Sequence, residues 1–464
     1  MIIKDLQNLL PNTIAADDYL PGMVLEVPEH GVPLLPKSVE RLLQLARSGI
    51  SLLTFKPALP VTSELGLGAL YPPLAYVYPQ AWSHGGQSVI SEFQKKLSGR
   101  PSALPALTLV SDLDQDEQIH YFSTHYGKVV PPRYVRVVVG NTCNLKCVMC
   151  PYHSAAIKPT HTTDFFQQHQ TMDWAMMERL ARDCGKAQAG VTIGNVEEPL
   201  LHPRVIDFIR RCRQEGVPRV HLTTNGQLLN SGRSQALLEA GLTSIDISLD
   251  AANPKTYFKI RGAHLERVEA NIMDLIEWRD RLHSPCEIRT SFVRNAGINS
   301  TEEQQFRDKW LTKINGVCVL NLAQYQDENM HLTTGNSIVQ NAVEWYAEQA
   351  GGRWACLFPF TEISILPDGR IYYCIETLFR LGFDQDITSL GNYKTQSLPE
   401  IWQGKPFQQL RQELILNQLV DRPMCRNCDA WKSQVVARTS QTGCNITTTQ
   451  IAEIYQLARD VNGR

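Results

Sequence analysis

The fold of this chain is decided by residues 134–150, which read YVRVVVGNTCNLKCVMC. The first six residues are mostly apolar and rich in β-branched side chains, and a short run of this kind predicts a buried strand. The run leads directly into Cys143, Cys147 and Cys150, which have the spacing C-x3-C-x2-C. Three thiolates on one loop suit a cubane iron–sulfur cluster, which normally takes four protein ligands. The missing fourth ligand leaves one iron open to a substrate or cofactor.

Two other interpretations of the three cysteines remain open on their spacing alone. They would form a zinc site if a residue such as His153 supplied a fourth ligand. They would carry no chemistry if they were only buried filler, because free cysteine is among the most buried residue types.

Strands and helices are predicted to alternate after the cysteine loop. Strand candidates lie at residues 190–193, 219–223, 244–249, 287–293 and 317–320, and helix candidates at 173–187, 204–215, 234–240, 254–260, 265–281 and 301–310. This alternation implies right-handed β-α-β crossovers and a parallel sheet. We therefore predict an α/β fold, a partial (β/α)6 barrel, with the cysteine loop at the carboxyl edge of the first strand.

Local signals refine these boundaries. Asn253 precedes a proline at the first helical position, and Ser300-x-x-Glu303 and Ser397-x-x-Glu400 have the form of capping boxes. Residues 449–459 are predicted to form a terminal helix.

The cysteine loop resembles the signature loop of the radical S-adenosylmethionine (SAM) enzymes. The resemblance implies a [4Fe-4S] cluster whose open iron binds SAM. An electron from that cluster cleaves SAM to a 5′-deoxyadenosyl radical, which takes a hydrogen atom from a substrate C–H bond. Met149, just before the last cysteine, stands where the family usually has an aromatic residue.

Polar residues at the ends of the later strands extend this resemblance. In residues 193–203, which read IGNVEEPLLHP, Glu198-Pro199 matches a glycine-glycine-glutamate-proline type of sequence that holds the SAM ammonium group. Glu197 takes the place of a glycine there. The third and fourth strands end in LTTNG and ISLDAA. The resemblance implies SAM contacts from Met149, Gly194, Asn195, Glu197, Glu198, Thr223, Asn225, Ser248, Asp250 and Arg289.

The last third of the chain carries five of the twelve cysteines. Cys356, Cys374 and the pair Cys425-x2-Cys428 resemble the auxiliary-cluster extension called SPASM, or its reduced twitch-like form. The resemblance implies one auxiliary [4Fe-4S] cluster bound by these four thiolates, although four cysteines with a C-x2-C half also suit structural zinc. Cys444 is left over. If Cys374 or Cys444 is free near the SAM site, it is a candidate to return a hydrogen atom to a substrate radical, as in epimerases.

Three domains are predicted: residues 1–130 of unknown role, residues 131–345 as the radical SAM barrel, and residues 346–464 as the auxiliary-cluster domain. Residues 1–130 are either a packing or dimerisation domain or a domain that presents the substrate. The net charge of -2, from 45 Lys+Arg and 47 Asp+Glu, gives no reason to expect nucleic acid. No apolar run is long enough for a membrane, and the residues MIIKD do not begin a signal peptide, so a cytoplasmic location is predicted.

The functional hypothesis is a radical SAM enzyme that modifies a ribosomally synthesised peptide by epimerisation, cross-linking or excision. The alternative is a dehydrogenase, dehydratase or epimerase of a sugar, aminoglycoside or other small molecule. Either would need an electron donor such as flavodoxin or ferredoxin. A third class, a zinc-binding scaffold without catalysis, remains open at this point.

Overall fold

The computed structural model describes residues 2–3, 24–27, 51–54, 131–154, 164–326, 329–332, 356, 358–374, 389–415, 418–431, 437–441, 444–449 and 452–457. The chain divides into two compact units. The first unit comprises residues 1–130, 334–360 and 408–437, and the second comprises residues 131–333, 361–407 and 438–464. The domain boundaries at residues 130 and 345 stay a prediction.

The first unit contains a small parallel sheet with the strand order β1-β2-β3. Its strands are β1 (Ile2–Ile3), β2 (Val24–Val27) and β3 (Ser51–Thr54). The short helix α17 (Pro423–Arg426) belongs to the same unit.

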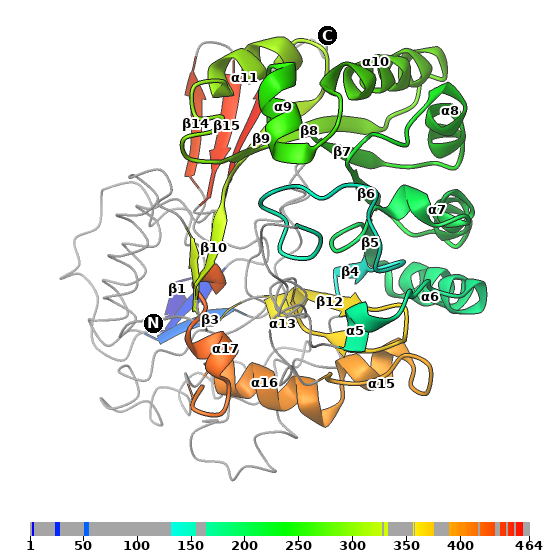
Figure 1. The fold of residues 1–464 in the computed structure, drawn as a ribbon. Coiled ribbons are helices and arrows are strands. Elements are labelled where there is room, and N and C mark those ends of the chain that lie inside the picture. The colour runs from blue at the N-terminus through cyan, green and yellow to red at the C-terminus, as the bar shows by residue number, and fades with distance from the viewer. Residues whose placement is uncertain are drawn as a thin grey trace, which may run out of the picture. The chain divides into compact units, whose positions relative to one another are not determined.

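The second unit is built on an 11-stranded sheet with the order β13-β12-β4-β5-β6-β7-β8-β9-β16-β15-β14 (Figure 1). Its central strands are β4 (Tyr134–Val137), β5 (Gly190–Ile193), β6 (Val220–Thr224), β7 (Ser244–Ser248), β8 (Glu287–Arg294) and β9 (Gly316–Asn321). These six strands are all parallel, so their carboxyl ends meet at one edge. The predicted α/β class and the six predicted strands are therefore confirmed.

Further strands extend the central six on both sides. Beside β4 lie the parallel strand β12 (Glu362–Ile365) and the antiparallel β13 (Ile371–Tyr372). Beside β9 lie β16 (Ala452–Leu457), which is antiparallel to it, then β15 (Cys444–Thr448) and β14 (Ala437–Gln441). A separate hairpin joins β10 (Ala323–Gln326) to β11 (Asn329–Leu332).

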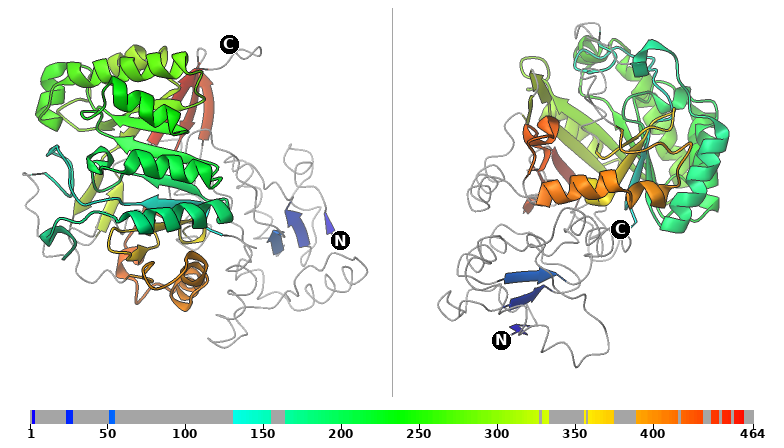
Figure 2. Two further views of the ribbon diagram at one scale, coloured as in Figure 1. Left: turned by 90° about the vertical axis from the view of Figure 1, so that its right-hand side faces the viewer. Right: turned by 90° about the horizontal axis from the view of Figure 1, so that it is seen from below.

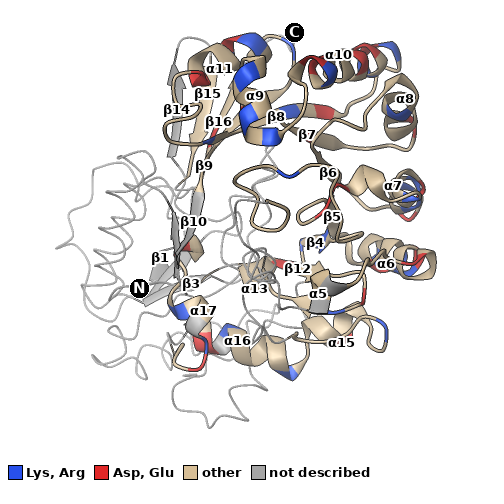
Figure 3. Cartoon of the chain, in the orientation of Figure 1, with Lys and Arg blue, Asp and Glu red and all other residues tan. Residues whose placement is uncertain are grey.

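Helices cover one face of this sheet (Figures 1 and 2). They are α6 (Trp174–Ala187), α7 (Val205–Gln214), α8 (Ser231–Glu239), α9 (Pro254–Arg261), α10 (Leu265–Arg281) and α11 (Glu303–Leu311). Strand side chains that meet these helices are apolar and buried, for example Val135, Ile245 and Ile288. Acidic and basic residues are intermixed on the outer surfaces of α7 and α10 (Figure 3).

Five other helices lie in the described part of the chain. They are α5 (Asp164–Gln167), the 3-10 turn η5 (Pro199–Leu201), α13 (Phe358–Thr361), α15 (Leu398–Trp402) and α16 (Lys405–Ile415). None of the described helices is long and apolar enough to cross a membrane.

Two of the three predicted helix caps are confirmed. The Asn253 side chain caps α9 by accepting a hydrogen bond from the Thr256 N–H, at 3.1 Å. Ser397 and Glu400 form the predicted capping box. The predicted box at Ser300 is wrong, because α11 begins only at Glu303, whose carboxylate instead pairs with Arg294 at 2.8 Å.

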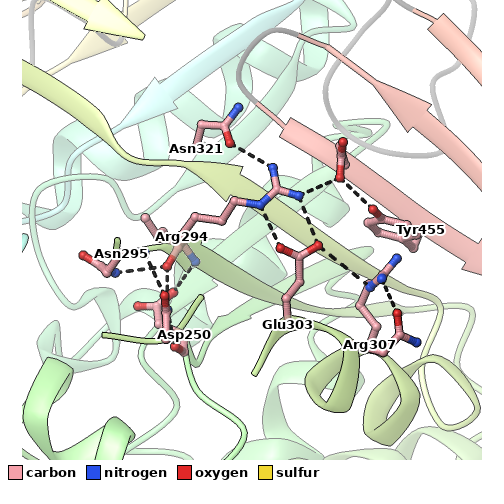
Figure 4. A network of polar contacts seen from close by, with 11 residues as sticks. Asp250, Arg294, Asn295, Glu303, Arg307, Asn321 and Tyr455 are labelled. Carbon is pink, nitrogen blue, oxygen red and sulfur yellow. Dashed lines mark hydrogen bonds and ion pairs between the residues drawn. The ribbon is translucent and has the colours of Figure 1, made fainter. Parts of the chain in front are cut away.

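The predicted helix over residues 449–459 is also wrong, because this segment contains β16. Its pairing with β9 supplies the backbone hydrogen bonds that a helix would have made internally. Arg294 at the end of β8 stabilises this edge of the sheet by binding Glu303, Asn321 and Glu453 (Figure 4). Arg307 also contacts Glu303, and the Tyr455 hydroxyl donates to Glu453. The tertiary partner therefore overrides the local preference of this segment.

Candidate functional site

The cysteine loop follows β4 at the carboxyl edge of the sheet. Its turn is held by the Cys150 N–H, which donates to the Cys147 carbonyl at 3.0 Å. The Val148 N–H donates to the carbonyl of Ile260 in α9 at 2.9 Å. The loop is therefore fixed both by its own backbone and by the helix that follows β7.

Every sulfur of the loop receives at least one N–H group. The donors are the Leu145 backbone to Cys143 (3.4 Å), Asn225 Nδ2 to Cys143 (3.8 Å), Arg261 Nη1 to Cys147 (3.7 Å) and the His153 backbone to Cys150 (3.4 Å). N–H groups directed at sulfur stabilise the thiolate form that binds iron and tune the cluster that it holds. This donor set fits an iron–sulfur cluster on Cys143, Cys147 and Cys150.

Burial raises the pKa of all three thiols, that of Cys143 to about 12. The metal-free thiols therefore hold their protons at neutral pH, and iron has to displace them on binding.

The zinc interpretation gains no support from His153. Its Nε2 lies 2.8 Å from the Val196 carbonyl oxygen, so this ring nitrogen is occupied by a backbone contact. Among the described residues, no three His, Cys, Asp or Glu side chains converge closely enough to hold a single metal ion.

Arg261 reaches Cys147 because a buried carboxylate holds it in place. Asp250 is fully buried and accepts from Arg261 Nε at 2.9 Å and from the Val293 N–H at 2.8 Å. Its φ of +67° lies in the left-handed region, which Asp adopts more readily than bulky residues do. The carboxylate of Asp250, a predicted SAM contact, is thus directed at Arg261 and at the Val293 N–H near the end of β8.

Glu198 organises the end of β6. Its Oε1 accepts from Thr224 Oγ1 (2.7 Å) and the Leu200 N–H (3.1 Å), and its Oε2 accepts from the Asn225 N–H (2.8 Å). Burial raises the pKa of Glu198, and these three donors oppose the rise. Because Asn225 in turn donates to Cys143, Glu198 and Asn225 form one hydrogen-bonded connection between β5, β6 and the cysteine loop.

Glu197 turns its side chain back into its own loop. The carboxylate accepts from the Val139 N–H at 2.9 Å and the Val196 N–H at 3.1 Å, and burial raises its pKa to about 7. It thus binds the end of β4 to the loop after β5, where a glycine would provide no side chain.

Gly194 is required at the start of this loop. Its φ is +94°, and a Cβ at this position would lie 2.4 Å from the Thr223 carbonyl oxygen. The close approach keeps β5 and β6 adjacent where their carboxyl ends meet. The neighbouring Asn195 is half-buried, and its Nδ2 forms no hydrogen bond with the described residues.

The remaining predicted SAM contacts are spread along the same edge and down the strands. Met149 is half-buried beside Cys150. Thr223 Oγ1 lies 3.3 Å from His221 Nε2, and Ser291 Oγ lies 3.5 Å from Ser248 Oγ. Arg289 is buried and turns toward Glu287 at the beginning of β8, away from the carboxyl edge.

The C-terminal cysteines are described separately in the two units. In the first unit, Cys356 precedes α13, and Cys428 Sγ accepts from the Ala430 N–H at 3.3 Å, while the Cys428 N–H donates to the Cys425 carbonyl. In the second unit, Cys374 is buried just after β13.

Cys444 begins β15, where it pairs with Leu457 at the end of β16. Since β16 is antiparallel to β9, this position is at the amino edge of the sheet, opposite the cysteine loop. The structure therefore does not bring Cys444 to the carboxyl edge, as a hydrogen-atom donor beside the first cluster would require.

Two residues outside the predicted set help to build this edge. Arg261 contacts Cys147, and Glu302 accepts hydrogen bonds from the Ala252 and Asn253 N–H groups, so it anchors the start of α9. Arg261 stands just before Gly262, the left-handed C-cap of α9. A basic residue at a helix end is common, so the sequence only weakly indicates that Arg261 belongs to the site. The Glu302 contact joins residues about 50 positions apart, so no local sequence pattern predicts it.

Comparison with known proteins gives two domain matches. Residues 137–277 match the radical SAM superfamily, and residues 356–429 match the SPASM iron-sulfur cluster-binding domain.

Among curated proteins, the GTP 3′,8-cyclase of Limosilactobacillus fermentum is 33% identical over 177 residues, which are 37% of this chain and 49% of that protein. The GTP 3′,8-cyclase of Chlorobaculum tepidum is 34% identical over 185 residues, or 39% of this chain and 50% of that protein. The chain thus spans about half the length of the curated relatives it matches.

Among solved structures, Streptococcus suis SuiB bound to S-adenosylmethionine is 16% identical, with a TM-score of 0.47 over 77% of this chain and 86% of that one. BtrN in complex with AdoMet and 2-DOIA is 18% identical, with a TM-score of 0.39 over 64% of this chain and 92% of that one.

The first matched region includes the cysteine loop and strands β5, β6 and β7, and the second includes Cys356, Cys374, Cys425 and Cys428. The chain therefore contains a radical SAM domain over residues 137–277 and a SPASM iron–sulfur cluster-binding domain over residues 356–429.

Proposed function

We propose that this protein uses a [4Fe-4S] cluster and SAM to remove a hydrogen atom from a substrate C–H bond. The observation that carries the proposal is the set of N–H donors on the sulfurs of Cys143, Cys147 and Cys150 at the carboxyl edge of the sheet. When bound, the cluster supplies the electron that cleaves SAM to methionine and a 5′-deoxyadenosyl radical, which becomes 5′-deoxyadenosine on taking the substrate hydrogen.

Several side chains position the groups that surround the three cysteine sulfurs. Asn225 and Arg261 direct N–H groups at two of the sulfurs, and Asp250 holds Arg261. Glu198 holds the Asn225 backbone, and its Oε2 has lone-pair capacity left for a ligand ammonium group. The proposed SAM contacts also include Met149, Gly194, Asn195, Thr223 and Ser248, together with the backbone of Glu197, whose side chain is turned back into its own loop.

The test is anaerobic reconstitution with iron and sulfide, followed by reduction with dithionite and mass-spectrometric detection of 5′-deoxyadenosine formed from SAM. Cys147→Ala should abolish the product. The control is Cys212→Ala, which removes a fully buried thiol from α7 instead. A reconstituted wild-type protein that leaves SAM intact would refute the proposal.

One auxiliary [4Fe-4S] cluster is proposed to be bound by four C-terminal cysteines, Cys356, Cys374, Cys425 and Cys428. The support is that the SPASM match covers all four. Two clusters require about eight iron atoms per chain. Cys374→Ala should lower that content toward about four if loss of one thiolate releases the auxiliary cluster, while Cys212→Ala should not. Unchanged iron content would remove Cys374 from the ligand set.

The substrate is proposed to be a ribosomally synthesised peptide, which the enzyme would epimerise, cross-link or cleave. The support is that residues 1–130 lie outside both matched domains and offer a separate part of the chain to hold a peptide. A flavodoxin or ferredoxin is proposed as the electron donor, in the cytoplasm.

A second candidate is a small-molecule substrate such as a sugar or aminoglycoside. It is favoured by the curated relatives, whose name gives GTP as their substrate. Deuterium transfer into 5′-deoxyadenosine distinguishes the two, because only the true substrate class can donate a labelled hydrogen. Transfer from a labelled sugar or nucleotide, and none from peptides, would replace the first candidate by the second.

A further inference from the structure

The strand face that turns away from the helices carries a layer of polar side chains. Asp246 on β7 and Arg289 on β8 are directly paired in the ladder, and Ser248 and Ser291 form the next pair toward the carboxyl edge. Side chains of paired strand residues project to the same face. Asp246 and Arg289 therefore stand side by side, roughly 7 Å along the strand below Ser248 and Ser291.

Each of these two side chains keeps one buried polar atom without a hydrogen-bond partner among the described residues. Asp246 Oδ1 and Arg289 Nε are both shielded from solvent, and neither forms a hydrogen bond with any residue in the described ranges. Arg289 is only 3% exposed, and its Nη2 binds Glu287 Oε2 at 2.5 Å, so Nε remains an available donor.

An unsatisfied buried polar group costs about 1–3 kcal/mol, so folded proteins rarely leave a neighbouring donor and acceptor both unpaired. Burial raises the pKa of Asp246, opposed by Ser291 and by the charge of Arg289. A ligand that donates to Oδ1 would favour the ionised carboxylate.

The charges in this layer balance, which selects against anionic ligands. Arg136 pairs with Glu362 at 2.9 Å, and Arg219 and Arg289 both contact Glu287. With Asp246, the three arginines face three carboxylates. His221 adds no charge, because burial and the nearby arginines lower its pKa to about 3. A polyphosphate needs unpaired cations, and this layer of the described residues has none in excess.

We propose that Asp246 and Arg289 bind the backbone of one substrate residue in an extended peptide, an inference that rests on the peptide substrate proposed above. Asp246 Oδ1 accepts from the N–H group of that residue, and Arg289 Nε donates to its carbonyl oxygen. In an extended chain the N–H and C=O of one residue point to the same side. The two protein groups stand on neighbouring strands about 4.8 Å apart, which suits such a pair.

The position of the pair suits a substrate of the radical step. β7 runs from Asp246 to its end at Ser248, and Asp250, two residues further on, holds Arg261 against Cys147. A peptide bound at the pair lies on the face of β7 and β8 that turns away from the helices, below the edge at which the cysteine loop follows β4.

The test uses reconstituted, SAM-loaded full-length protein and three probes: N-acetylalanine N-methylamide as a minimal peptide, GTP as an anion and inositol as a neutral polyol. Saturation-transfer NMR reports binding of each. The peptide analogue should bind, and Asp246→Ala and Arg289→Met should each weaken it at least tenfold. Asp246→Asn keeps an acceptor oxygen and should restore most of the affinity.

Thr290→Val is the matched control. Thr290 also has a buried hydroxyl without a described partner, but it lies on the helix-covered face, so its replacement should leave binding unchanged. Iron content and circular dichroism verify that each variant is folded.

Unaltered peptide binding in both Asp246→Ala and Arg289→Met would overturn the assignment, as would binding of GTP or inositol in place of the peptide analogue. Wild-type protein that cleaves SAM but does not bind the analogue refutes this inference alone. Wild-type protein that does not cleave SAM refutes the proposed function.

Discussion

The buried pair Asp250–Arg261 offers the sharpest test of how the cysteine loop is held. Asp250 is fully buried, and Arg261 is 8% exposed. Replacing Arg261 by Met removes the cation and leaves the Asp250 carboxylate with the Val293 N–H as its remaining contact among those described above. Breaking a buried pair by removing one partner costs about 3–5 kcal/mol, because a desolvated charge is left unpaired.

The cost should fall when both charges are removed. Asp250→Asn preserves the side-chain shape, and Asn tolerates the left-handed backbone that Asp250 adopts at φ +67°. The double variant Asp250→Asn/Arg261→Met therefore removes both charges of the pair and should be more stable than Arg261→Met. A coupling energy of about 2–3 kcal/mol is expected for two residues in direct contact.

The assay is urea unfolding of the metal-free protein, followed by far-UV circular dichroism for the wild type, both single variants and the double variant. Arg281→Met is the control, because the Arg281–Glu277 pair is more than half exposed and should contribute at most about 0.5 kcal/mol. If the effects of the two single variants simply add, the pair does not stabilise the loop and the reasoning fails.

Four further predictions follow from single contacts. Asn225→Leu removes the side-chain donor to Cys143, so the reduction potential of the reconstituted cluster should fall by some tens of mV in an EPR titration; an unchanged potential would exclude Asn225 as a tuning group. Gly194→Ala places a Cβ 2.4 Å from the Thr223 carbonyl, whereas Gly216→Ala has a similar positive φ and no atom within 4 Å. Both should lose about 1–2 kcal/mol to backbone strain, and thermal unfolding should show a clearly larger loss for Gly194→Ala; equal losses would contradict the close approach. The pKa of Glu197 is raised to about 7, so its contribution to stability is complete below pH 4.5 and is lost as the pH rises through 7, by at most about 3 kcal/mol. Glu197→Gln should flatten that decline in urea unfolding measured from pH 5 to 8, and a wild-type curve without the decline would count against it. Glu453→Gln weakens the ion pair with Arg294 that is 2.7 Å long, so amide exchange in β16 should accelerate, while Glu277→Gln on the exposed face of α10 serves as the control and should leave it unchanged.

The repeating core of the fold was predictable from the sequence because it depends on local patterns. β-branched apolar runs placed all six central strands, and the helices between them have the predicted order, with boundaries that shift by a few residues. Asn253 and Ser397 were predicted as caps because a capping side chain bonds to a backbone only two or three residues away.

The errors occurred where distant residues decide the outcome. Residues 452–457 form β16 because the edge of β9 offers unpaired backbone groups, and no local signal announces that edge. Glu303 was predicted as a cap but binds Arg294, which β8 brings within reach from nine residues away. The direction of the Asp250 carboxylate likewise depends on Arg261, which α9 carries back to the loop.

The sequence by itself determined the loop that is proposed to hold the cluster, since three cysteines at the spacing C-x3-C-x2-C and the strand that precedes them are contiguous along the chain. The tertiary structure alone decided what surrounds those thiolates. Asn225 and Arg261 come from the third and fourth β-α units, and they reach Cys143 and Cys147 only because parallel strands bring their carboxyl ends to one edge. The pairing of Asp246 with Arg289 has the same origin, because the register between strands more than 40 residues apart is set by the packed sheet and not by either segment.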